Sequence, residues 1–285
     1  MLRADRIPPA LLVLAAVASV QFGGALAKTL FDDVGPGGAV FLRVFFAALV
    51  LAAVWRPTTA GRSAGDWRLV LAYGVALVAM NLSFYEALDR IPLGIAVTFE
   101  FVGPLGVAVF GSRRALDLLW VLLAAAGIVL LSDFGNADLD GVGVALALLA
   151  GAFWAAYILL AARVGRVYPG GQGLAIAMGA GALIVAPVGV ADGGSDLLAA
   201  GVLATGFGVA MLSSALPYTL ELEALRRMPA GVFGVLMSLE PAMAALAGFI
   251  VLGEDLAARE LVAIVLVVTA SAGAARGAGV PPRDA

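Results

Sequence analysis

Long apolar runs make up most of this chain, and they limit its possible folds more than any other feature. About ten runs are bounded by charged residues or by Gly and Pro turns: 8–30, 36–55, 67–88, 94–111, 115–132, 140–161, 171–191, 197–222, 229–252 and 257–275. Each is close to the roughly 20 residues that a helix needs to cross a bilayer core. The mean hydropathy of +1.05 fits lipid as the solvent. We therefore expect an all-α integral membrane protein with about ten transmembrane helices.

The first run has a second interpretation. Arg3 and Arg6 precede an apolar stretch that reaches Ala25-Leu26-Ala27, which is also the pattern of a secretory signal and its cleavage site. The run is longer than the usual signal core of about 7 to 15 residues. It also contains Gln21 and Lys28, which a segment destined for removal does not need. We expect a retained membrane span.

Basic residues concentrate in alternate loops. Thirteen of the 17 lie there, the chain ends included: Arg3, Arg6, Arg56, Arg62, Arg68, Arg113, Arg114, Arg163, Arg166, Arg226, Arg227, Arg276 and Arg283. The opposite loops carry only Arg90 and Arg259 and are otherwise acidic. Short loops rich in Arg and Lys face the cytoplasm. The pattern predicts a multi-pass protein of the cytoplasmic membrane with both termini in the cytoplasm.

The two halves of the chain resemble each other. Residues 86–104 align without a gap with residues 223–241, and residues 36–38 repeat the Pro-Gly-Gly of residues 169–171. Each half has five runs, an odd number, so the second half enters the membrane upside down. We predict two inverted five-helix repeats, 8–132 and 140–275. Chance similarity between Gly-rich apolar helices is the alternative.

Composition excludes several kinds of chemistry. The chain has no His and no Cys, which rules out disulfides, thiolate catalysis, Cys/His metal sites and His-dependent triads. An intramembrane enzyme would need a carboxylate pair, and no run holds aspartates away from its ends. The sequence has no phosphate-binding G-x-x-x-x-G-K-[ST] motif. Its net charge of -3 provides no electrostatic attraction for nucleic acid. We expect a carrier that is no enzyme and uses no cofactor, metal or nucleic acid.

Six short motifs indicate a family. They are Pro92–Ala96, Glu100–Leu105, Ser112–Arg114, Ala215–Glu221, Leu236–Ala242 and Leu252–Glu254. With them the chain resembles the EamA-type drug/metabolite transporters, most closely the threonine/homoserine exporters, over almost its whole length. The resemblance implies a ten-helix inner-membrane carrier with a central cavity that exports small amino acids such as threonine or homoserine. An EamA-type exporter of another metabolite or a drug is the alternative.

Three charged side chains are predicted at similar depth in the outer half of the membrane: Lys28, Arg43 and Glu100. A charge at that depth must face a cavity or a partner. Arg43 and Lys28 suit the carboxylate of an amino acid, and Glu100 suits its ammonium group. An ion pair between Arg43 and Glu100 is the alternative, and a substrate that enters the cavity can break such a pair.

Further candidates for substrate binding are polar or aromatic residues within the runs: Gln21, Asn81, Tyr85, Trp154 and Tyr157. Gln21 lies seven residues before Lys28, and Asn81 lies four residues before Tyr85, so each pair shares one face of a helix. For the two aromatic residues on run 140–161, ordinary packing is the alternative.

Glu240 lies near mid-membrane, immediately before Pro241, and the sequence offers it no evident basic partner. Because burial in lipid favours the neutral carboxyl group, Glu240 is a candidate for proton exchange, with Glu100 the second candidate. A neutral Glu240 bonded to a carbonyl freed by Pro241 is the alternative. Pro104 and Pro241 occupy aligned positions and are expected to kink both helices.

Glu221 and Glu223 lie near the inner end of run 197–222, close in sequence to Arg226 and Arg227. We expect ion pairs between these acidic and basic residues at the membrane surface. A role in an inner gate is the alternative.

Overall fold

The computed structural model describes residues 7–58, 60–91, 93–112, 114–131, 140–247 and 258–278. All regular elements in these ranges are helical, which confirms the expected all-helical class. In chain order they are α1 (Pro9–Lys28), α2 (Phe31–Trp55), α3 (Ala64–Leu88), α4 (Leu93–Glu100), α5 (Val102–Gly111), α6 (Ala115–Leu131), α7 (Gly141–Val167), α8 (Gln172–Gly193), η2 (Gly194–Leu198), α9 (Ala200–Ala210), η3 (Met211–Ala215), α10 (Leu216–Arg227), α11 (Ala230–Met237), α12 (Leu239–Ala247) and α13 (Ala258–Ala278).

Five helical segments in the described ranges are long and apolar enough to cross a membrane: Phe31–Trp55, Ala64–Leu88, Gly141–Val167, Gln172–Leu198 and Ala200–Arg227. Shorter apolar helices lie in the remaining predicted runs. Large apolar side chains cover the outside, among them Phe110, which is 93% exposed, and Leu183, which is 79% exposed. An apolar exterior of this kind suits lipid, because soluble proteins rarely expose large contiguous apolar patches.

Two helices are interrupted at aligned positions of the two halves. Phe101 separates α4 from α5 with φ -64° and ψ -13°, and Ser238 separates α11 from α12 with φ -62° and ψ -11°. Each lies three residues before a proline, Pro104 or Pro241, whose ring nitrogen cannot donate to the carbonyl four residues earlier. The prolines therefore weaken the helical hydrogen bonding where each helix is broken.

The α2 helix begins five residues before the predicted run, at Phe31. Its first turn bends at Gly35, which has φ 67°, a left-handed conformation that glycine adopts without strain. The next residue is Pro36, and the backbone N–H of Gly37 donates to Oδ2 of Asp192 at 3.0 Å. The end of α8 thus satisfies an amide that the bend leaves without a helical partner.

The run predicted over 197–222 contains a π turn, η3, between α9 and α10. Pro217 lies just after it, as the second residue of α10. Without an N–H, Pro217 cannot bond to the carbonyl of Ser213, four residues earlier. The π turn and the proline together leave Ser213 with a carbonyl oxygen that can accept from another helix.

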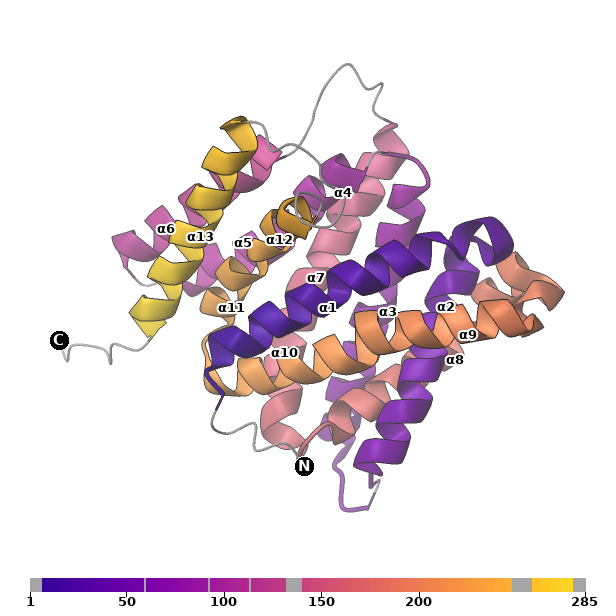
Figure 1. Ribbon diagram of the computed structural model, residues 1–285. Helices are drawn as coiled ribbons and strands as arrows, with labels where there is room; N and C mark the ends of the chain where they lie inside the picture. The colour runs from indigo at the N-terminus through magenta and orange to yellow at the C-terminus, as the bar shows by residue number, and fades with distance from the viewer. Residues whose placement is uncertain are drawn as a thin grey trace.

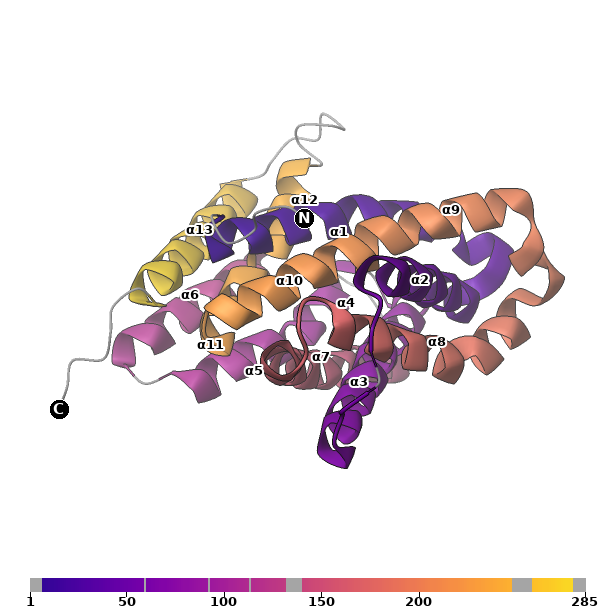
Figure 2. The same cartoon turned by 90° about the horizontal axis from the view of Figure 1, so that it is seen from below.

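The principal helix contacts join the first half of the chain to the second. α2 packs along α8, α6 against α13, α5 against α11, α3 against α7, and α1 against α10. Figure 1 shows α1 alongside α9 and α10, and both Figure 1 and Figure 2 place α6 with α13 at one end of the bundle and α8 with α9 at the other. No division into two separate bundles is seen over these residues.

Glycines bring α5 and α7 into backbone contact. A Cβ on Gly103 would clash with the carbonyl oxygen of Gly151, and a Cβ on Gly151 would lie 2.5 Å from the carbonyl oxygen of Glu100. That carbonyl is the one that Pro104 leaves without a helical partner. Small residues of this kind allow membrane helices to approach closely.

Candidate functional site

Arg43 lies in the middle of α2, only 6% exposed, and makes four hydrogen bonds. Nε donates to Oγ of Ser214 at 2.7 Å, and Nη2 donates to the carbonyl of Ser213 at 2.6 Å. Nη1 donates to the hydroxyl of Tyr85 at 3.1 Å, and Nη2 donates to the hydroxyl of Tyr218 at 3.0 Å. The guanidinium therefore joins α2 to α3, η3 and α10. We call Arg43 and the polar residues around it, described below, the Arg43 cluster.

All four partners of Arg43 are neutral groups. The guanidinium has five N–H donors and is always charged, so one N–H of Nη1 is left without a partner among the described residues. The ion pair considered for Arg43 and Glu100 is not formed. A buried positive charge that only neutral groups contact favours the entry of an anionic group.

Three carboxyl groups lie near this charge. Glu221 is 2% exposed, and Oε2 accepts a hydrogen bond from the hydroxyl of Tyr157 at 2.7 Å. Glu100 is buried and Glu240 is half-buried, and neither carboxyl group has a hydrogen-bond or ion-pair partner in the described ranges. All three are close enough to Arg43 to interact with it electrostatically.

Aromatic rings form one wall of the cluster. The ring of Tyr157 on α7 lies between Tyr73, at 5.5 Å between centroids, and Tyr218, at 5.4 Å. Nδ2 of Asn81 donates to the hydroxyl of Tyr218 at 3.1 Å and to the carbonyl of Leu77 at 2.7 Å. The Tyr73 hydroxyl is buried and has no hydrogen-bond partner among the described residues. Asn81, Tyr85 and Tyr157, all expected from the sequence, are thus brought together with Arg43.

The other candidates from the sequence lie beside this cluster. Nε2 of Gln21 donates to the backbone carbonyl of Glu240 at 3.1 Å and so joins α1 to α12. Trp154 is buried edge-on against Phe101, with ring centroids 4.9 Å apart, at the break between α4 and α5. Lys28 ends α1, and its side chain lies outside the described residues.

Sequence reasoning missed Ser213, Ser214 and Tyr218 as partners of Arg43. The one available signal was Pro217, which frees a carbonyl at Ser213. Nothing in the sequence marked η3 as a π turn, so the direction in which these side chains point was not predictable.

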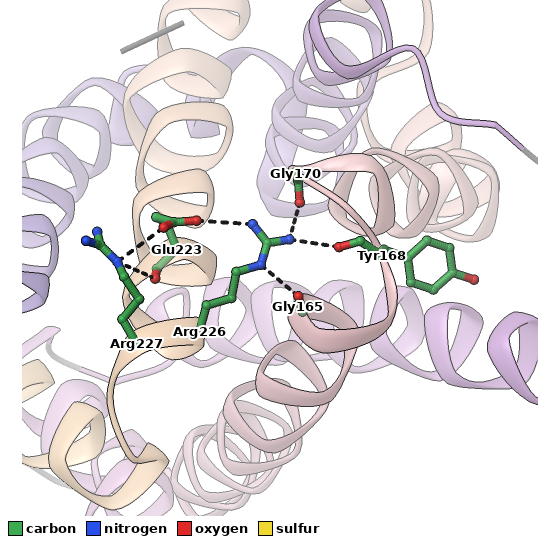
Figure 3. A network of polar contacts seen from close by, with 6 residues as sticks. All are labelled: Gly165, Tyr168, Gly170, Glu223, Arg226 and Arg227. Atoms are coloured by element: carbon green, nitrogen blue, oxygen red, sulfur yellow. Dashed lines mark hydrogen bonds and ion pairs between the residues drawn. The ribbon is translucent and has the colours of Figure 1, made fainter. Parts of the chain in front are cut away.

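The expected ion pairs are correct for Glu223 and wrong for Glu221. Figure 3 shows Glu223 between two arginines, with Oε2 3.1 Å from Nη1 of Arg226 and Oε1 3.2 Å from Nε of Arg227. Glu221 instead points toward Tyr157. Residues two apart on a helix lie on nearly opposite faces, so only one of the two glutamates can reach the arginines.

Arg226 also ties the end of α10 to the connection between α7 and α8. Nε donates to the carbonyl of Gly165 at 2.7 Å, and Nη2 donates to the carbonyls of Tyr168, at 2.9 Å, and Gly170 (Figure 3). One arginine thus donates hydrogen bonds to three carbonyl groups near the C-terminus of α7, where a helix lacks internal partners for such groups.

Tyr168 extends this network to α3. Its hydroxyl donates to the carbonyl of Asp66 at 2.9 Å, and the guanidinium of Arg62 lies 4.3 Å from its ring centroid. Burial raises the pKa of the Tyr168 hydroxyl, and the charge of Arg62 opposes that rise. The hydroxyl therefore stays protonated at neutral pH and keeps its donor role.

Comparison with known proteins identifies relatives along most of the chain. The threonine/homoserine exporter RhtA of Escherichia coli (strain K12) is 45% identical over 268 residues, which cover 93% of this chain and 90% of the relative. The exporter of the same name from Salmonella typhimurium (strain SL1344) is 44% identical over the same length. A chain described only as a crystal structure of a protein superimposes with a TM-score of 0.76 at 20% identity, and covers 95% of this chain and 97% of its own. That last likeness concerns the fold alone.

A family model described as the EamA-like transporter family matches twice, over residues 7–132 and 141–275. The two matches include all of α1, all of α13 except its last three residues, and every residue of the Arg43 cluster. Together with the apolar exterior, they agree with a multi-pass membrane transporter. The chain belongs to the EamA-like transporter family.

Proposed function

We propose that this protein is a secondary carrier of the cytoplasmic membrane that exports small amino acids such as threonine and homoserine. The exporters at 44 to 45% identity support this substrate class. The observation that carries the proposal is the buried charge of Arg43, which only neutral groups contact and which lies near three carboxyl groups. A zwitterion needs both signs of charge in one site.

In this proposal the substrate carboxylate binds Arg43. The free N–H of Nη1 gives one hydrogen bond directly, and a second follows when the Tyr85 hydroxyl moves away. The ammonium group faces Glu100, whose carboxyl group has no partner in the described ranges. We expect Asn81 and Tyr218 to bond a substrate hydroxyl. Gln21, Lys28, Trp154 and Tyr157 complete the proposed site.

We further propose ten membrane spans arranged as two inverted repeats, residues 8–132 and 140–275. Two observations support this arrangement. The breaks at Phe101 and Ser238 fall at aligned positions with nearly identical dihedral angles. The helix contacts also follow a twofold pattern: the second spans of the two halves pair as α2 with α8, and the fifth pair as α6 with α13.

Contacts between loops support cytoplasmic termini. Loops predicted on the inner side touch one another: Arg227 donates to the carbonyl of Ile7, and Arg62 packs on Tyr168. On the side predicted to be outer, Arg90 lies 3.7 Å from Asp140. Together with the distribution of arginines, these contacts favour both termini in the cytoplasm.

Proton exchange is the proposed coupling, with Glu240 as the carrier and Glu100 as the second candidate. Glu240 follows the break at Ser238, is half-buried, and has no partner for its carboxyl group among the described residues. A glutamate in that environment can exist in both protonation states during one transport cycle.

Flux measurements in proteoliposomes test the proposed function. Purified protein is reconstituted, loaded with unlabelled threonine, homoserine or an unrelated cationic dye, and exchange with external labelled threonine is followed. Saturable exchange with threonine and homoserine, lost in Arg43→Ala, is the expected result. Transport of the dye without amino-acid exchange would remove amino acids as substrates and favour the drug-exporter alternative.

A further inference from the structure

A groove lies where α7 ends and α10 turns into α11. Its volume is about 420 Å³. One part of the wall is apolar, from Leu159 on α7 to Met228 at the turn, and the other part carries four arginines: Arg163, Arg166, Arg226 and Arg227. The groove is separate from the Arg43 cluster, with which it shares no lining residue.

The arginines of the groove carry more charge than the protein neutralises. Arg226 and Arg227 share a single carboxylate, that of Glu223 (Figure 3). Arg163 and Arg166 are exposed and have no hydrogen-bond or ion-pair partner in the described ranges. Nη2 of Arg227 is buried, and no described residue gives it a hydrogen-bond partner. Four arginines line the groove and only two of them share the Glu223 carboxylate, which leaves an excess of positive charge around the groove.

The position of the groove places this charge at the edge of the apolar exterior. Arg163 and Arg166 lie in the last two turns of α7, and the exposed Leu159 lies one turn further in. Basic residues near helix C-termini also stabilise the negative end of a helix. This stabilisation accounts for arginines at the helix C-termini, but it does not account for the apolar wall of the groove between them.

We propose that the groove binds the headgroup of an anionic phospholipid. Arg163 and Arg166 would hold the phosphate, and the start of an acyl chain would cover the wall from Leu159 to Met228. A free phosphate ion would leave that wall in water. The headgroup of a zwitterionic lipid would bring an ammonium group toward the arginines, which favours a lipid with net negative charge.

The test uses the full-length protein purified in an uncharged detergent, with short-chain dioctanoyl phosphatidylglycerol as the probe and native mass spectrometry as the readout. The groove variant is Arg163→Gln with Arg166→Gln. The matched control is Arg68→Gln with Arg114→Gln, which removes two exposed arginines from the same predicted side outside the groove. We expect about 30-fold weaker binding in the groove variant and little change in the control.

Three results would overturn the proposal. Equal weakening in both double variants would indicate surface charge in general. Equal binding of dioctanoyl phosphatidylcholine would show that the anionic headgroup is not recognised, and inorganic phosphate that binds as tightly as the lipid would indicate a free-anion site. If the groove variant aggregates, the single variants Arg163→Gln and Arg166→Gln give the same test. We then expect lipid binding to be about fivefold weaker in each.

Discussion

The carbonyl oxygen of Ser213 accepts a hydrogen bond from Nη2 of Arg43 at 2.6 Å, across the boundary between the two halves of the chain. Pro217, four residues further on, has no N–H to donate to that carbonyl. A bond that a regular helix would make within itself is thus replaced by a bond between helices. The same arginine that we propose as the carboxylate ligand also holds the two halves together.

Two substitutions of Arg43 distinguish the contribution of its positive charge from that of its planar guanidinium group. Arg43→Ala removes the hydrogen bonds that Arg43 donates to the Ser213 carbonyl and to two tyrosine hydroxyls, and we expect threonine exchange to fall by about 100-fold, roughly 3 kcal/mol. Arg43→Lys keeps the charge but lacks the planar fork, and we expect a loss of about tenfold. Exchange is measured in proteoliposomes, with gel filtration to verify folding. Normal flux in a well-folded Arg43→Ala protein would show that Arg43 is not a substrate ligand.

Two stacked tyrosines provide a matched pair of variants. Tyr157→Phe removes the only hydrogen bond to the Glu221 carboxyl group in the described ranges, and we expect a loss of about 1 to 3 kcal/mol of stability. Tyr73→Phe removes a buried hydroxyl for which the described part of the chain offers no hydrogen-bond partner, so stability should be unchanged or slightly higher. Unfolding in sodium dodecyl sulfate measures both. Equal destabilisation by the two variants would contradict a structural role for the bond to Glu221.

Glu240→Gln tests the proposed proton coupling. The amide keeps the size of the side chain but cannot release a proton, so export driven by a pH gradient should fail. Exchange of labelled for unlabelled threonine at equal pH should continue, because alternating access itself is retained. Glu223→Gln, which alters a surface ion pair, serves as the control. If pH-driven accumulation persists in Glu240→Gln, the coupling lies elsewhere, with Glu100 the next candidate.

Gly103 and Gly106 on α5 provide a second matched pair. A Cβ at position 103 meets the backbone of Gly151, which cannot rotate away, whereas a Cβ at position 106 meets nothing within 4 Å. We expect Gly103→Ala to cost about 3 kcal/mol or more and Gly106→Ala to be neutral or stabilising. Thermal unfolding in detergent measures the difference. Similar stability of the two variants would show that α5 and α7 do not meet through their backbones.

Introduced cysteines test the orientation, since the chain contains none of its own. Ala60→Cys lies in a loop predicted to be cytoplasmic, and Ser195→Cys lies in a loop predicted to be external; both positions are exposed. An impermeant thiol reagent added to intact cells should label position 195 and not position 60. The opposite pattern would place both termini outside.

The helical class and much of the Arg43 cluster could be predicted from the sequence. Apolar length predicts helices in lipid, and polar side chains in such runs must find partners, which singles out Arg43, Asn81 and Tyr85. The partners of Arg43 on η3 and α10 could not be predicted. Depth along a helix follows from counting residues, but the direction in which a side chain points depends on how the helices pack.

The direction of side chains around the helix axis accounts for the remaining differences between the expected and the observed site. The π turn at 211–215 rotates the following helix relative to a regular one, so a count of 3.6 residues per turn does not predict that Tyr218 points toward Arg43. Glu221 and Glu223 were treated alike because they are neighbours in sequence, although they face nearly opposite directions. Both errors come from the angle around the helix axis, which hydropathy does not report.

The contact between α5 and α7 also limits how the protein can move. Gly103 and Gly151 leave no side chain between the two helices. In the other half, the position aligned with Gly103 is Glu240. It lies on α12, which Gln21 of α1 contacts. A line of touching backbones cannot be compressed, so the helices on that side can only slide along it or turn about it. Any conformational change that involves this contact must therefore keep the separation between α5 and α7.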